Sequence, residues 1–235
     1  NNDYNWQDLA QVQDSRADID CDPTQPLEIS TDWGSAASFL SVGQERSFDF
    51  SAKLISQTPI DCTINEFYVK RDDETDTEVN ALADKFLVYY EHHACKRVTL
   101  YRDRYGDAKR ANSKKSYNEL FVERLQRFGW EVEQRVHPGM EPPQHEKFLL
   151  WTYILSETDA RFPRVRFNAT RCRHTLISMQ NTRVVEDSQG RFAKDKSSER
   201  KQSILPEDAT HFGDCVDKRI WTKYYTRLRG LNSTF

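Results

Sequence analysis

Alternating apolar and polar residues near the beginning of this chain predict several β-strands. We expect a first strand from about Leu27 and a second over residues 36–44, with a turn between them after Asp32. A third strand is expected at 62–70. Residues 75–91 change to the spacing of an amphipathic helix, with apolar side chains three and four positions apart. The pattern therefore predicts antiparallel strands first and a helix after them.

The second half of the chain mixes strands and helices. Gly129 marks the end of one helix, because glycine is favoured just after a helical C-terminus. We expect strands at 98–101, 130–136 and 165–167, helices at 116–128, 144–156, 170–181 and 206–228, and a β-hairpin at 183–196. This order predicts an α/β or α+β fold in which helices flank a mixed sheet.

Composition excludes several classes of protein. No apolar run approaches the roughly 18 residues of a membrane-spanning helix, so we expect no membrane association. The five cysteines show no C-x-x-C spacing, which favours a reducing cytosolic setting over a disulfide framework or zinc knuckle. His211 and Cys215 lie four positions apart, but two ligands do not make a zinc site. The sequence also lacks the P-loop pattern G-x-x-x-x-G-K-[ST], so this chain by itself is no ATPase motor.

Positive charge is concentrated in two segments of an otherwise acidic chain. The formal net charge is −3. Residues 96–115 carry a balance of +6 and residues 161–201 a balance of +7, which leaves −16 for the remainder. Such segments are expected either to form a local track for a polyanion or to be two unrelated solvated surfaces.

Acidic residues stand at the ends of several predicted elements and are the candidates for catalysis. Hard cations such as Mg²⁺ and Mn²⁺ prefer oxygen ligands, and two of them about 3.5–4 Å apart can activate water and neutralise charge in phosphodiester hydrolysis. We expect strand ends and one helix to aim carboxylates at such a site. The candidates are Asp32, Asp103 and Asp214 as catalytic ligands, with Asp217 and Glu66 as additional metal ligands.

Each candidate also has a purely structural interpretation. Asp32 and Asp103 could be ordinary turn residues at strand ends. Asp214 and Asp217 share a helix face, where two carboxylates repel unless a cation or base lies between them. One of them could be solvated, and Asp214 is the preferred ligand. Glu66 lies in a strand and could simply point into solvent.

An ordered series of short motifs resembles the C-terminal nuclease domain of the large terminase subunit of tailed bacteriophages. The series is P-L-E-I-S-T-D-W-G-S-A-A-S-F-L-S-V-G-Q, I-N-E-F-Y-V-K, R-V-T-L-Y-R-D-R-Y-G, F-G-W-E-V and H-F-G-D-C-V-D, within residues 25–225. The resemblance implies an RNase H-like fold and an endonuclease that uses Mg²⁺ or Mn²⁺ to cut concatemeric viral DNA during packaging. Asp32, Asp103 and Asp214 match the acids of that family, and Asp217 is an accessory.

The resemblance also implies DNA contacts and partners. Residues 183–205 match the auxiliary hairpin of the family. The partners would be double-stranded DNA, the terminase ATPase domain, the portal protein and the small terminase subunit, and the location would be the host cytoplasm rather than the mature virion. Candidate phosphate contacts are Lys109, Arg110, Lys114 and Lys115 after Asp103, and Arg191, Lys194, Lys196, Arg200 and Lys201 in the hairpin segment.

The expected organisation is one nuclease domain at 26–225 between a polar tail or linker at 1–25 and a tail at 226–235. The chain does not begin with methionine, so we expect a fragment of a longer protein. Two other functions remain open. One is another RNase H-like nuclease, such as a resolvase or integrase acting on branched DNA. The other is a non-catalytic module that docks onto DNA or a portal ring.

Overall fold

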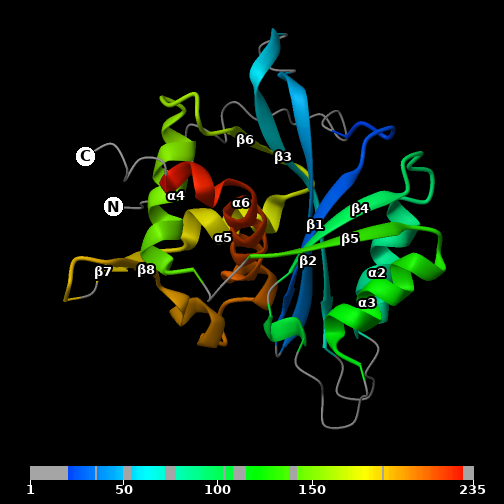
Figure 1. The fold of residues 1–235 in the computed structure, drawn as a ribbon. Coiled ribbons are helices and arrows are strands. Elements are labelled where there is room, and N and C mark those ends of the chain that lie inside the picture. Colours follow the sequence, from blue (N-terminus) through cyan, green and yellow to red (C-terminus); the bar gives the residue numbers. More distant parts are fainter. Residues whose placement is uncertain are drawn as a thin grey trace.

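A computed structural model describes residues 21–34, 36–49, 54–71, 78–102, 104–107, 115–137, 142–186 and 188–229. A six-stranded mixed sheet forms its centre, with α2 and α3 on one face and α4, α5 and α6 on the other (Figure 1). No helix among these residues is long and apolar enough to cross a membrane.

The strands are β1 (Leu27–Trp33), β2 (Ala37–Asp49), β3 (Leu54–Lys70), β4 (Arg97–Arg102), β5 (Glu131–Val136), β6 (Arg164–Phe167), β7 (Val184–Glu186) and β8 (Phe192–Lys194). The α-helices are α2 (Glu78–Tyr89), α3 (Tyr117–Arg127), α4 (Gln144–Ser156), α5 (Arg173–Asn181) and α6 (His211–Arg229). Short 3₁₀ turns are η1 (Tyr105–Asp107), η2 (Lys196–Arg200) and η3 (Pro206–Asp208).

The order of strands across the sheet is β5-β4-β1-β2-β3-β6, and β7 pairs with β8 in a separate hairpin. The first three strands run antiparallel, as the sequence predicts, whereas β4 lies parallel to β1 and β5 parallel to β4. Parallel neighbours end at the same edge of the sheet. The chain segments that follow β1, β4 and β5 therefore emerge together.

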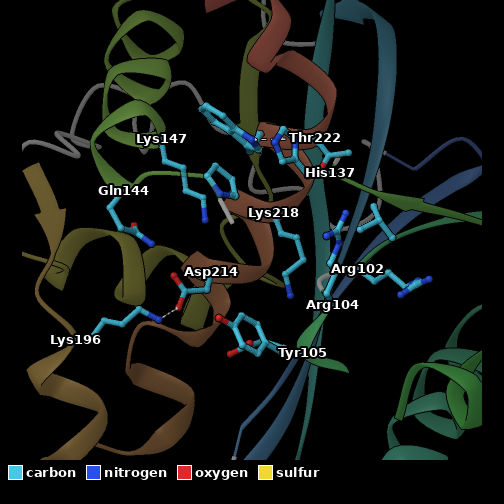
Figure 2. Close-up of a pocket in the computed structure, with 14 residues that line it drawn as sticks. Arg102, Arg104, Tyr105, His137, Gln144, Lys147, Lys196, Asp214, Lys218 and Thr222 are labelled. Carbon is cyan, nitrogen blue, oxygen red and sulfur yellow. Dashed lines mark hydrogen bonds and ion pairs between the residues drawn. The ribbon is translucent and has the colours of Figure 1, made fainter. Parts of the chain in front are cut away.

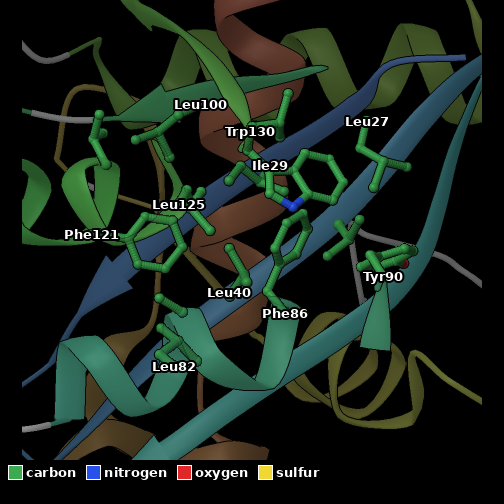
Figure 3. Close-up of a cluster of buried hydrophobic side chains, with 14 of the residues drawn as sticks. Leu27, Ile29, Leu40, Leu82, Phe86, Tyr90, Leu100, Phe121, Leu125 and Trp130 are labelled. Atoms are coloured by element: carbon green, nitrogen blue, oxygen red, sulfur yellow. The ribbon is translucent and has the colours of Figure 1, made fainter. Parts of the chain in front are cut away.

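Alternation along β1 separates an apolar face from a polar one. Leu27 and Ile29 are fully buried and pack with residues of α2 and α3, among them Phe86 and Phe121, in the larger core (Figure 3). A second core joins α4, α5, α6 and β6 around Trp151 and Ile220. Burying these aromatic and aliphatic side chains drives the helices onto both faces of the sheet.

The polar face of β1 meets α6 in a ladder of contacts. Asp32 pairs with His211, Ser30 Oγ donates to the carbonyl of Cys215, and Glu28 Oε2 lies 4.0 Å from Arg219 Nε. Every second residue of a strand advances about 6.7 Å, and every fourth residue of a helix about 6 Å. Because the two repeats nearly match, α6 can follow β1 in the opposite direction, with its first turn beside the end of the strand.

A buried ion pair fixes the register of that ladder. Asp61 on β3 and Arg219 on α6 are both 0% exposed, and Arg219 Nη2 lies 2.8 Å from Asp61 Oδ1. Lys223 Nζ reaches the other carboxylate oxygen of Asp61 at 2.7 Å. Burial would raise the pKa of Asp61, but the charges of Arg219 and Lys223 outweigh it and hold the pKa below its usual range.

Element boundaries differ modestly from the sequence predictions. The strand β3 extends back to Leu54, and the last predicted helix divides into η3 and α6. Helix α3 has the capping box of Ser116 and Glu119, and Gly129 follows it with φ of +84°. The helix α6 continues to Arg229, past the expected domain end at 225. The predicted helix start at 75 lies outside the described residues.

Substitution of Gly43 by alanine tests the buried ion pair. A Cβ at Gly43 would lie 1.9 Å from Arg219 Nη1, so the guanidinium would have to leave Asp61 and Thr63. We expect Gly43→Ala to lower the free energy of unfolding by about 2 kcal/mol or more, because it separates a buried guanidinium from its carboxylate partner. Urea denaturation measures this. A change as small as that of Lys201→Ala, at an exposed position, would contradict the assigned role.

Candidate active site

Asp32 and Asp214 line one cleft between the end of β1, the start of α6 and the start of α4 (Figure 2). Its volume is about 380 Å³. The parallel register of β1 and β4, in which Ser30 pairs with Tyr101, brings the ends of both strands to it. The cleft is also rich in cations, which are Arg102, Arg104, Lys147, Lys196 and Lys218.

Asp103 lies outside the described residues, and its placement stays a prediction. Its neighbours Arg102 and Arg104 both line the cleft. Among the described residues there is no group of three or more His, Cys, Asp or Glu side chains that could hold a metal ion. The described carboxylates that line the cleft are Asp32, at a strand end, and Asp214, on a helix.

Asp32 is held by His211 from the first turn of α6. His211 Nδ1 lies 2.8 Å from Asp32 Oδ2, and the imidazole stacks on Phe39 with ring centroids 4.6 Å apart. Burial lowers the pKa of His211, but the hydrogen bond and the charge of Asp32 raise it more, so the net shift is upward. This pair fixes one carboxylate oxygen of Asp32 and leaves its side chain 24% exposed to the cleft.

Asp214 is neutralised by two lysines of the hairpin segment. Lys194 Nζ lies 2.8 Å from Asp214 Oδ1, and Lys196 Nζ lies 2.6 Å from Oδ2. Burial raises the pKa of Asp214, but Lys194 and Lys196 overcome this and hold the pKa far below its usual range. Asp214 is thus ionised at neutral pH, as a metal ligand must be.

Asp217 takes a structural position beside Asp214. It is 3% exposed, accepts from Trp151 Nε1 at 2.7 Å, and lies 2.5 Å from Lys194 Nζ. The expected repulsion between two carboxylates on one helix face is relieved because Lys194 lies between them. Lys194 is thereby buried within the protein, and an internal ion pair takes the place of its expected phosphate contact.

Glu66 caps a helix and does not line the cleft. Its Oε1 accepts from the backbone N–H of His174, and its Oε2 accepts from the backbone N–H and hydroxyl of Thr175, at 2.6–2.8 Å. These are groups of the first turn of α5, where a carboxylate satisfies unpaired backbone donors. The structure therefore separates Glu66 from the two cleft acids, unlike the expectation that it is a metal ligand.

The remaining predicted phosphate contacts are distributed unevenly. Lys196 lines the cleft and pairs with Asp214. Lys115 lies before α3 and pairs with Glu123 at 2.6 Å. Arg191, Arg200 and Lys201 are exposed on the hairpin segment. Lys109, Arg110 and Lys114 fall outside the described residues. The structure thus brings one of these candidates, Lys196, to the cleft acids while leaving it half exposed.

A chain of hydrogen bonds connects the end of β1, which carries Asp32, with the segment that follows β4. Trp33 Nε1 donates to Asn118 Oδ1 at 2.8 Å, and Asn118 Nδ2 donates to Asp107 Oδ1 at 3.1 Å. Asp107 also pairs with Arg102 at the end of β4. The residue after Asp32 and the residue before Asp103 are therefore linked through α3 and η1.

Among the residues that were not predicted from the sequence are His211, which holds Asp32, and Lys218 and Lys147, which line the cleft. His211 stands three positions before Asp214, and that H-x-x-D spacing on one helix face was the signal that could have identified it. Lys218 follows Asp214 by four positions on the same helix. Lys147 had no signal, because only the packing of α4 beside α6 brings it to the site.

The pairing of His211 with Asp32 makes a measurable prediction in metal-free protein. Replacing Asp32 by asparagine removes the charge that raises the pKa of His211, whereas burial, which lowers it, remains. We expect the pKa of His211, followed by NMR titration with a chelator present, to fall in Asp32→Asn. The surface variant Asp159→Asn serves as the control. An unchanged titration in Asp32→Asn would show that the two side chains do not interact in solution.

Comparisons with known proteins give a likeness of fold. No family model matches the sequence, and no curated protein matches it. The HK97 bacteriophage large terminase aligns with a TM-score of 0.50 at 10% identity, over 91% of this chain and 43% of that protein. The chain thus spans less than half the length of the HK97 protein.

Two nuclease domains align over most of both chains. That of the Thermus phage P74-26 large terminase has a TM-score of 0.49 at 11% identity, over 95% of this chain and 96% of its own. The g2p large terminase nuclease domain of bacteriophage SPP1, with bound Mn, has a TM-score of 0.46 at 12% identity, over 88% and 94%. The mixed sheet with helices on both faces and a separate hairpin is thus similar in fold to the HK97 large terminase.

Proposed function

We propose that this chain is a metal-dependent DNA endonuclease that cuts viral DNA during genome packaging. The observation that carries the proposal is the convergence of Asp32 and Asp214, from a strand end and a distant helix, on a cleft lined by five cationic side chains. Carboxylates suit hard cations, and the surrounding cations suit a phosphate backbone. The likeness in fold to the HK97 large terminase supports the same function.

The residues of the cleft fit Mg²⁺ or Mn²⁺. Asp32 and Asp214 offer carboxylate oxygens, and their side chains are 24% and 18% exposed. Asp103 would join them, because the register of β1 and β4 carries both strand ends to one edge of the sheet. Bound cations would activate a water molecule and neutralise charge on the leaving oxygen.

The protein side chains have separate roles in the proposed reaction. His211 orients Asp32 through its Nδ1 hydrogen bond. Lys194 and Lys196 balance the charge of Asp214 when no cation is bound and would yield part of that position to one. The cleft cations bind phosphate oxygens, which carry no base information, so cleavage is weakly sequence-specific and weakens as salt rises.

The packaging setting follows from the same resemblance. The substrate is double-stranded DNA in the host cytoplasm. The ATPase domain of a large terminase, the portal protein and the small terminase subunit are the partners that such a nuclease requires. Exposed basic residues of the hairpin segment, Arg191, Arg200 and Lys201, would lie along the DNA beyond the cleft.

Loss of either cleft carboxylate tests the proposed reaction. We expect Asp32→Asn and Asp214→Asn each to reduce plasmid nicking with Mn²⁺ by about 100-fold or more, because each removes a charged ligand of the proposed cations. DNA binding measured with chelator should persist. The matched control is Asp84→Asn, because Asp84 lies on α2 and forms a surface ion pair with Arg124 of α3.

The outcomes distinguish the competing functions. If wild type and both variants are equally inert while DNA binding persists, the chain is a docking module. Strong preference for four-way junctions over linear or supercoiled duplex would favour a resolvase. Full activity in Asp32→Asn would exclude the proposed site itself.

Lys196 competes with divalent cations for Asp214, and its removal tests this. The Lys196 side chain is 48% exposed, so the pair is screened and contributes less than about 1 kcal/mol. We expect Lys196→Ala to lower the Mn²⁺ concentration for half-maximal cleavage by about two- to fivefold. Lys85→Ala, at an exposed lysine of α2 on the opposite face of the sheet, should leave this concentration unchanged. A higher Mn²⁺ requirement in Lys196→Ala would mean that the lysine supports metal binding.

A further inference from the structure

The cleft continues past the two acids along α6, and there its walls are positively charged. Lys218 lies one helical turn after Asp214, Lys147 comes from α4, and Arg104 follows β4. Figure 2 shows the side chains of Asp214, Lys147 and Lys218 around the same space. The sign of the surface therefore changes within one cleft, from carboxylates at one end to ammonium groups along its length.

Lys218 is held in position by the sheet. Its Nζ donates to the backbone carbonyl of Thr31, the residue before Asp32. Four residues of helix separate it from Asp214, a rise of about 6 Å. Lys218 therefore lies beside Asp214 along the cleft, one helical turn away on the same wall.

Lys147 contributes a second cation from the opposite wall. The residue is 8% exposed, although it lines the cleft. Gln144, one turn earlier on α4, lines the same wall. This wall thus presents a cation and an amide group to the cleft.

The size of the cleft suits a single strand of DNA rather than a duplex. A cleft of about 380 Å³ has the size of a small-molecule site and cannot enclose a duplex. Beyond the lysines it contains Val136, Pro142 and Trp221, which offer apolar surface to a sugar or base. Lys196 is engaged by Asp214 and belongs to the acidic end.

We propose that Lys147, Lys218 and Arg104 form a subsite for the phosphate adjacent to the scissile phosphate, on one strand of DNA. The inference rests on the proposed nuclease function and adds the path of the DNA strand. From the two acids, this DNA strand would run along α6, between α4 and the end of β5. These cations position the substrate without touching the reacting bond.

The salt dependence of DNA binding tests the subsite. Binding of a fluorescent duplex is measured with chelator between 50 and 200 mM KCl, and the logarithm of the affinity is plotted against the logarithm of salt concentration. Each lost phosphate contact reduces the slope by about 0.9. We expect that reduction in Lys218→Gln and in Lys147→Gln. With Mn²⁺, KM should rise while kcat is unchanged, because the contact binds ground and transition states equally.

Controls separate charge from folding. Lys147→Arg keeps the charge and should retain the wild-type slope, whereas Lys85→Gln removes an exposed charge from α2 on the opposite face and should change neither slope nor KM. Thermal melts confirm that each variant is folded.

Failure of the phosphate subsite and failure of the nuclease proposal would give different results. If wild type cleaves DNA but folded Lys147→Gln and Lys218→Gln keep its slope and KM, the subsite is rejected and the nuclease proposal stands. If wild type binds DNA with lysine-dependent slopes yet never cleaves with Mg²⁺ or Mn²⁺, the nuclease proposal fails and the cleft is only a phosphate-binding site. A fall in kcat alone would also overturn the subsite, because it would assign the lysines to the chemical step.

Discussion

The ion pair between Asp61 and Arg219 sets the position of α6, and the candidate site depends on that position. Both side chains are fully buried, so any sliding of the helix along the sheet would strand two charges away from water. The similar repeats of strand and helix then carry this register up to Ser30 and finally to Asp32. A constraint in the middle of the domain thereby determines which turn of α6 faces the end of β1.

Charge balance is the second constraint on the site. Carboxylates gathered for cations repel one another when no cation is bound, and the protein meets this cost with its own bases. Lys194 lies between Asp214 and Asp217, Lys196 holds the outer oxygen of Asp214, and His211 pairs with Asp32. The hairpin segment is therefore part of the site as well as a basic surface, because two of its lysines complete the acidic cluster.

The same arrangement explains how an acidic chain can present a basic cleft. The net charge is −3, yet cations outnumber carboxylates around the cleft because three sequence regions converge there: the end of β4, the start of α4 and the middle of α6. Among the described cations of the basic segment at 161–201, Lys196 is the one that lines it. Local geometry, more than total charge, decides where a polyanion is attracted.

The sequence by itself determined most of the elements and directed attention to Asp32 and Asp214, which the structure brings to one cleft, while their catalytic role stays a prediction. Periodicity located the strands and helices to within a few residues, apart from the early extension of β3 to Leu54, and element ends identified Asp32 and Asp214. Tertiary structure alone decided that Glu66 caps α5, that Lys194 is internal, that Lys147 lines the cleft and that His211 pairs with Asp32. Periodicity reports which face of an element is buried, whereas these roles depend on which residue of another element lies opposite, and that is fixed only when α4 and α6 pack against the sheet.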